Sequence, residues 1–139
     1  MGHPVIPEIS KHSKWWIPKY RFLELKYFCL QYPEWKREAA DLLIRPGQNR
    51  IQNGVRGQVE FTDSTGNIAI RLLALHSKIA LIDKVASEID PPLSEFILKA
   101  VTEGVSFVKL KTMYEIPCER DMYYDRYRKF FYILNGFRE

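Results

Sequence analysis

Residues 91–134 read PPLSEFILKAVTEGVSFVKLKTMYEIPCERDMYYDRYRKFFYIL, and this stretch decides the fold. The paired prolines end whatever helix precedes them, and apolar residues then recur every three or four positions in three successive runs. The spacing predicts three helices, over Leu93–Thr102, from Ser106 to Tyr114, and over Cys118–Leu134. Two short helices, a tight corner and a longer basic helix are typical of a helix-turn-helix unit.

Three positions in this stretch carry local structural signals. Gly104 stands where the first helix should end, and glycine adopts the left-handed conformation of a C-cap without strain. Ser106 is placed to accept a hydrogen bond from a backbone amide in the first turn of the next helix. Ile116 precedes Pro117 in the corner, and we expect it to fill the space between the second and third helices.

Upstream, the strongest periodicity of the chain predicts a helix over residues 65–89. Its apolar positions alternate in steps of three and four and are Ile68, Leu72, Leu75, Ile79, Ile82, Ala86 and Ile89. Asp63-Ser64-Thr65 offers side chains that could cap its beginning. A helix of this length can form the seam of a homodimer or pack inside one monomer, and the sequence leaves both alternatives open.

The N-terminal part predicts a helical hairpin. One helix should run from Ile17-Pro18 to Pro33 and a second over Glu34–Ile44, followed by a loop over 45–62 that is rich in Gly, Asn, Gln and Arg. Six aromatic residues in this part are expected mainly in the core, with a stacking surface for bases as the alternative: Trp15, Trp16, Tyr20, Tyr27, Tyr32 and Trp35.

The expected fold class is therefore all-α, with an N-terminal helical hairpin, one long central helix and a C-terminal helix-turn-helix unit. Residues 1–16 are predicted to be a flexible arm, residues 17–62 the hairpin with its loop, and residues 63–139 the long helix with the helix-turn-helix unit. At 139 residues, these parts should form one compact domain overall.

Composition excludes several classes of protein. No stretch approaches the ~20 consecutive apolar residues of a transmembrane helix, and the first 16 residues lack the apolar core of a signal peptide, so we expect a cytoplasmic protein without a membrane partner. Cys29 and Cys118 are expected to be reduced thiols. His3, His12 and His76 are scattered, so neither a metal site nor a cofactor is expected. No nucleophile, acid–base or phosphate-loop pattern predicts an enzyme.

The charge distribution indicates where a polyanion would bind. The formal net charge is +4, but residues 63–104 carry four Lys/Arg against six Asp/Glu, whereas residues 105–139 carry seven against five. Because the third helix of a helix-turn-helix unit enters the major groove, we expect contacts with double-stranded DNA there. The expected contact residues are Arg120, Tyr124, Arg126, Arg128 and Lys129, with Lys109 and Lys111 bracing the DNA backbone.

The run from Glu95 to Leu134 resembles the C-terminal part of small proteins encoded by phages and integrated elements of Gram-positive bacteria. These include the RinA/ArpU-type late-gene regulators, whose C-terminal half is similar to region 4 of sigma factors. The aromatic and basic ending YYDRYRKFF at 123–131 and the upstream run KYRFLELKYF at 19–28 carry the likeness. The resemblance implies promoter DNA binding by a recognition helix over 118–131, contact with RNA polymerase, and no catalysis.

The acidic residues of the third helix favour an alternative. Glu119, Asp121 and Asp125 lie among its cations and would repel phosphate if they faced DNA. The second interpretation is therefore a protein–protein adaptor or inhibitor that docks on RNA polymerase, a sigma factor or a phage structural protein without touching DNA.

Overall fold

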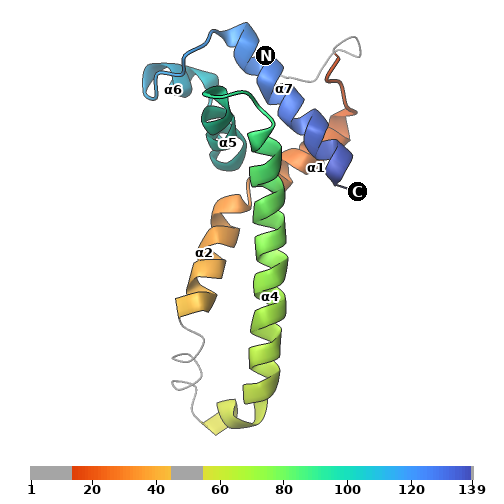
Figure 1. Ribbon diagram of the computed structural model, residues 1–139, viewed down its shortest axis with the longest axis vertical. Helices are drawn as coiled ribbons and strands as arrows, with labels where there is room; N and C mark the ends of the chain where they lie inside the picture. The colour runs from red at the N-terminus through yellow and green to blue at the C-terminus, as the bar shows by residue number, and fades with distance from the viewer. Residues whose placement is uncertain (1–13, 45–54, 139) are drawn as a thin grey trace. The chain divides into compact units, whose positions relative to one another are not determined.

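The computed structural model describes residues 14–44 and 55–138, in which the backbone forms helices and connecting turns and no strand (Figure 1). This confirms the all-α prediction. The helices are α1 (Lys19–Cys29), α2 (Tyr32–Ile44), α4 (Val55–Ser87), α5 (Leu93–Glu103), α6 (Phe107–Thr112) and α7 (Arg120–Phe137). The expected flexible arm lies outside the described residues up to residue 13, and so does the expected loop over 45–54.

The chain divides into two compact units. Unit 1 comprises the chain up to Gln31 and from Leu81 onward, and unit 2 comprises Tyr32–Ala80. The division separates α1 from α2, so the two helices predicted to pair as a hairpin belong to different units. The boundary between the units also falls within α4. The first part of this helix belongs to unit 2, and its last turns belong to unit 1.

Helix α4 begins ten residues earlier than the sequence predicted. Residues 55–62 were expected to be loop, and Asp63-Ser64-Thr65 was expected to cap the helix, yet all of them lie inside α4. Between Pro46 and Pro91 the sequence contains no proline, and an internal glycine costs a helix only about 1 kcal/mol. Polar and glycine-rich composition alone therefore does not end this helix.

Unit 2 contains α2 and the adjoining part of α4. Helix α2 begins at Tyr32, so Pro33 occupies its first turn, where a missing N–H costs no hydrogen bond, rather than ending the helix before it. Trp35 is buried, and Lys78 of α4 lies 5.3 Å from its ring centroid. The guanidinium of Arg71 donates two hydrogen bonds of 2.8 Å to the carboxylate of Glu38.

Unit 1 is built around α7, which packs against α1 and α5 (Figure 1). Phe22 of α1 meets Phe131 of α7 edge to face, with ring centroids 5.1 Å apart. Ile82 and Ile89 bring the end of α4 and the turn after it into the same core, which agrees with the predicted apolar face. The fully buried side chains of unit 1 include Leu25, Cys29, Ile82, Val85, Ile89, Ile97, Leu110, Ile116, Phe130, Phe131 and Leu134.

The short connections between α5, α6 and α7 follow the local signals in the sequence. Gly104 is left-handed, with φ of 71°, and its N–H bonds to the carbonyl of Ala100. The hydroxyl of Ser106 accepts the N–H of Lys109 at 3.2 Å, which caps α6. Ile116 is buried, and its N–H donates to the carbonyl of Leu110 at 3.0 Å, which closes the corner. These three predictions are confirmed.

The ends of α7 differ from the prediction. The helix begins at Arg120 rather than Cys118, and it continues past the expected end at Leu134 through Asn135 and Gly136 to Phe137. Asn135 accepts a hydrogen bond from the side chain of Arg21 on α1. The same arginine also donates to the carbonyl of Arg138. Contacts from α1 therefore hold the end of α7 where local sequence preference would stop it.

Candidate nucleic-acid interface

Arg126, a predicted DNA contact, is held in ion pairs inside unit 1. Its Nε lies 2.7 Å from Oδ1 of Asp90, in the turn after α4, and its Nη1 lies 2.7 Å from Oδ2 of Asp125. Its side chain is only 25% exposed. The guanidinium holds the pKa of Asp90 below its usual value, because a hydrogen bond and a nearby positive charge both favour the ionised carboxylate. The main partners of Arg126 are therefore carboxylates of the protein itself.

Two further cations in the middle of α7 are also partly covered. The ammonium of Lys129 lies 5.8 Å from the ring centroid of Trp15. That indole donates from Nε1 to Asp125 at 2.9 Å and meets the ring of Tyr132 at a centroid distance of 5.4 Å. Arg128 is half-buried, and its Nε is enclosed with no hydrogen-bond partner in the described structure. Among the described residues, Arg126 is thus the ion-paired cation in the middle of α7, and Arg126, Arg128 and Lys129 are all half-buried.

The cations beside the corner are more accessible. Lys109 on α6 and Arg120 at the start of α7 are exposed, and neither forms an ion pair with any described residue. The guanidinium of Arg120 lies 5.1 Å from the ring centroid of Phe107. Lys111 is exposed and bonds both the carbonyl of Cys118 at 3.1 Å and Oε2 of Glu119 at 3.2 Å. These three cations form the available basic surface of the predicted set.

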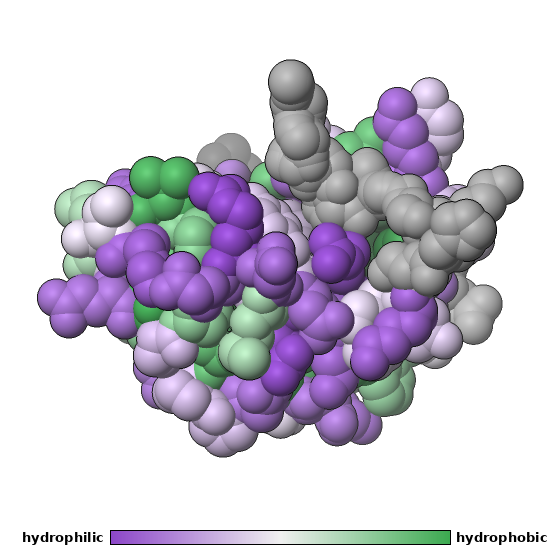
Figure 2. Space-filling view, turned by 90° about the horizontal axis from the view of Figure 1, so that it is seen from above, coloured by the Kyte–Doolittle hydropathy of each residue, from purple (hydrophilic) through white to green (hydrophobic). Residues whose placement is uncertain are grey.

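The same corner carries acidic and apolar side chains. Residues 107–122 contain three cations and three carboxylates, the latter being Glu115, Glu119 and Asp121, so their formal charges balance. Four large apolar side chains of this segment are exposed: Val108, Met113, Tyr114 and Met122. In Figure 2, hydrophilic side chains alternate with smaller apolar areas over the face that is shown. The corner is therefore a mixed surface and not a uniformly basic one.

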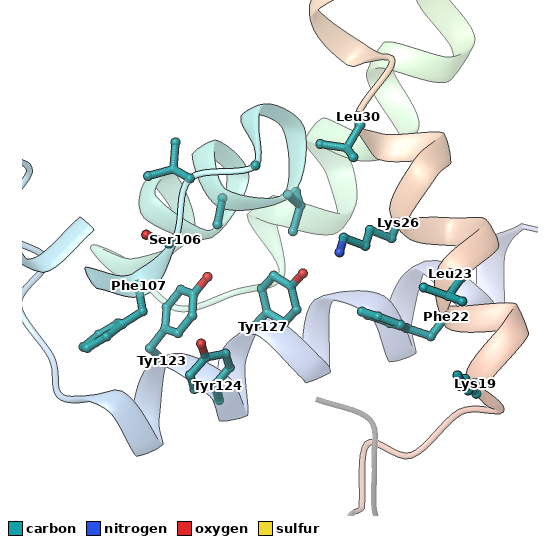
Figure 3. Close-up of a pocket in the computed structure, with 14 residues that line it drawn as sticks. Lys19, Phe22, Leu23, Lys26, Leu30, Ser106, Phe107, Tyr123, Tyr124 and Tyr127 are labelled. Carbon is teal, nitrogen blue, oxygen red and sulfur yellow. The ribbon is translucent and has the colours of Figure 1, made fainter. Parts of the chain in front are cut away.

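Tyr124, the remaining predicted contact, lines a pocket within unit 1. The pocket has a volume of about 350 Å³ and lies between α1, the end of α5, the connection to α6, and α7 (Figure 3). Burial raises the pKa of Tyr123 and of Tyr127, whose rings also line it. From α1, Lys19 and Lys26 line the same pocket. No sequence pattern distinguishes these two lysines, because only the packing of α1 on α7 brings them beside the tyrosines.

The aromatic residues of the N-terminal part divide between core and surface. Tyr32 and Trp35 are buried, as expected. Tyr20 and Tyr27, also expected in the core, are 76% and 60% exposed, because the inward face of α1 is formed by Phe22, Leu25 and Phe28.

Neither cysteine is disulfide-bonded, and both are buried. Desolvation raises the pKa of the Cys29 thiol to about 12 and also raises that of Cys118, so both are protonated near neutral pH. Within the described ranges, no group of three His, Cys, Asp or Glu side chains is placed to hold a metal ion. No helix among those residues combines the length and the apolar character that crossing a bilayer requires.

Comparisons with family models, with curated proteins and with solved structures gave no match for this chain. What the α6–α7 region does is therefore inferred from its own residues.

Proposed function

We propose that the chain binds double-stranded DNA through the corner between α6 and α7, as a transcriptional regulator of a phage or another mobile element. The observation that carries this proposal is the exposure of Lys109 and Arg120 on the two helices that flank the corner. Neither cation has a carboxylate partner among the described residues, so each can neutralise a phosphate without first losing an ion pair.

The corner has further features that suit DNA. Lys111 and Glu119 form an exposed ion pair, with side chains 40% and 86% exposed. Such pairs contribute only about 0–1 kcal/mol, so a phosphate can replace the carboxylate at little cost. Tyr124 lies one turn after Arg120 and can donate its hydroxyl. In this proposal Arg126, Arg128 and Lys129 position α7, and the direct contacts come from Lys109, Lys111, Arg120 and Tyr124.

The test measures how affinity for a fluorescently labelled duplex changes with salt. Fluorescence anisotropy between about 50 and 200 mM salt gives the slope of log K against log salt, which reports the phosphates neutralised. Replacing Lys109 and Arg120 together by alanine should weaken binding. It should also reduce the magnitude of the slope by about 1.8, which is 0.9 for each lost phosphate contact.

The matched control removes the same charge elsewhere. Lys36→Ala with Lys84→Ala also lowers the net charge by two, but these exposed lysines lie on α2 and α4. We expect this double variant to bind nearly as the unaltered protein does. Equal losses in the two double variants would show a net-charge effect and would contradict binding at the corner.

The apolar side chains exposed at the corner favour a second candidate function, docking on another protein. Exposed apolar groups interspersed with balanced charges are common in protein–protein interfaces. The partner would be RNA polymerase, a sigma factor or a phage structural protein. Its test is co-purification from host extract before and after nuclease treatment.

In that test, Met113→Ser with Met122→Ser should abolish capture of a partner that survives nuclease, because both side chains are exposed at the corner. The double variant Lys109→Ala with Arg120→Ala should retain such a partner. Loss of every captured protein on nuclease treatment would contradict the adaptor and agree with DNA binding.

A further inference from the structure

The pocket between α1 and α7 has walls of two kinds. Its apolar walls include Phe22, Leu23 and Leu30 from α1, together with Ala100 and Val101 from α5. The opposite side is formed by the rings of three tyrosines of α7, with Phe107 beside them (Figure 3). A volume of about 350 Å³ is near the lower end of the range for small-molecule sites.

The charged groups of this pocket have one sign. Lys19 and Lys26 line it, and no Asp or Glu does. Neither ammonium forms an ion pair with a carboxylate anywhere in the described ranges, although Lys19 lies 5.4 Å from the ring centroid of Tyr20. Figure 3 shows the side chain of Lys26 extending from α1 toward Tyr127. The pocket therefore attracts anions, and the protein supplies none of its own there.

The tyrosines add hydrogen-bond donors that the protein does not use. Tyr123 is buried and Tyr127 is half-buried, but within the described structure their hydroxyls form no hydrogen bond. Figure 3 shows the hydroxyls of Tyr123 and Tyr127 pointing to the side of the pocket that α1 and α5 enclose. Because these hydroxyls face the pocket and have no hydrogen-bond partner in the described structure, they are available to a ligand.

We propose that this pocket binds a small organic anion with an aromatic or aliphatic body. Lys26 and Lys19 hold the acidic group, and the hydroxyls of Tyr123 and Tyr127 donate hydrogen bonds to it. The body of the ligand lies against Phe22 and Leu23. Of the four proposed DNA contacts, Lys109, Lys111 and Arg120 lie outside the pocket, whereas Tyr124 lines it.

The test compares two fluorescent probes of nearly the same shape. 1-Anilinonaphthalene-8-sulfonate carries a sulfonate, whereas N-phenyl-1-naphthylamine is its neutral counterpart. We expect saturable binding of the anionic probe with one site per chain, and weaker binding of the neutral probe. Failure of the anionic probe to saturate at one site, or equal affinity for the two probes, would overturn the proposal.

Charge removal then locates the site. Lys19→Gln with Lys26→Gln should weaken binding of the anionic probe by about tenfold, as expected for two partly exposed charge contacts. The same variant should change binding of the neutral probe by less than about twofold. The control is Lys84→Gln with Lys99→Gln, two lysines of unit 1 that lie outside the pocket. Equal weakening of both probes, or an equal effect of the control, would contradict the assignment.

A variant that fills the pocket completes the test. Leu23→Trp places a large side chain at the α1 wall and should abolish binding of both probes while the far-ultraviolet circular dichroism stays helical. Val105→Trp fills the pocket from the connection before α6 and should do the same if Leu23→Trp fails to fold. Undiminished binding in a folded variant of either kind would place the probe elsewhere and overturn the proposal.

Discussion

The first turn of α7 and its middle both carry cations but use them differently. In the first turn, Arg120 is exposed, its guanidinium lies 5.1 Å from the ring centroid of Phe107, and it forms no ion pair among the described residues. Two turns later, Arg126 bonds two carboxylates, and Lys129 lies over the indole of Trp15. The number of cations along a helix therefore does not determine how many are available to a ligand. What matters is which side chains neighbouring elements bring against them.

The largest expected effect tests whether the middle of α7 is structural. Phe130 is fully buried between α7 and its neighbours, so Phe130→Ala should lower the free energy of unfolding by about 3–5 kcal/mol. Met122→Ala, in the exposed first turn, should change it by less than about 0.5 kcal/mol. Urea denaturation followed by circular dichroism measures both. Similar values for the two variants would remove the contrast between the two parts of the helix.

The next effect concerns the connection between α5 and α6. Gly104 has φ of 71°, and a Cβ there would lie 3.7 Å from Cδ2 of Leu30, so the cost of Gly104→Ala is backbone strain rather than a clash. We expect a loss of about 1–2 kcal/mol in the free energy of unfolding. Gly136→Ala is the control, because a Cβ there meets nothing within 4 Å. In α7 it should stabilise by up to about 1 kcal/mol. Two losses of the same size would contradict this reading of Gly104.

The next prediction, a smaller effect, compares replacement of Arg126 by alanine with replacement of Arg120 by alanine. The pair of Arg126 with Asp90 is partly exposed, with side chains 25% and 49% exposed, so Arg126→Ala should destabilise by no more than about 1 kcal/mol. In the DNA titration it should leave the salt slope nearly unchanged, whereas Arg120→Ala should reduce its magnitude by about 0.9. A larger change of slope for Arg126→Ala would move the DNA contacts back to the middle of α7.

The smallest effect is a pH dependence. Because Arg126 lowers the pKa of Asp90 from 3.8 in the folded chain, this carboxylate stabilises the fold above that value. Its contribution is lost as pH falls through the lowered pKa, where the folded chain also takes up the proton. As pH is lowered from neutral to below about 3.8, the stability of Asp90→Asn should therefore fall less than that of the unaltered protein. Thermal melts measure this difference. Arg126→Gln should reduce the pH dependence to the same extent. If the pH profile is unchanged in both variants, the ion pair between Arg126 and Asp90 does not stabilise the fold.

The sequence predicted those parts of the fold that depend on near neighbours. Gly104 and Ser106 cap their helices within a few residues, and both were correctly placed. The end of α7 was missed, because Arg21 contacts Asn135 across 114 residues. The start of α4 was missed as well, because its glycines and polar residues weaken a helix without ending it.

The candidate site was less predictable for the same reason. The cations of α7 were identified, but the ion pair between Arg126 and Asp90 spans 36 residues and is visible only in the fold. Lys19 and Lys26 received no role from the sequence, since α1 had to be packed on α7 before they met the tyrosines. A pattern of residue types identifies the candidate groups, and tertiary contacts decide which of them remain free.

The contact of Trp15 with α7 has a practical consequence for spectroscopy. The three tryptophans of the chain are Trp15, whose indole bonds Asp125, Trp16, which is exposed, and Trp35, which is buried in unit 2. Replacing Trp16 and Trp35 by phenylalanine leaves Trp15 as the sole source of tryptophan emission, which then reports events at α7. Replacing Trp15 and Trp16 leaves emission from Trp35, which reports unit 2. Unlabelled protein thus provides a separate optical signal for each compact unit.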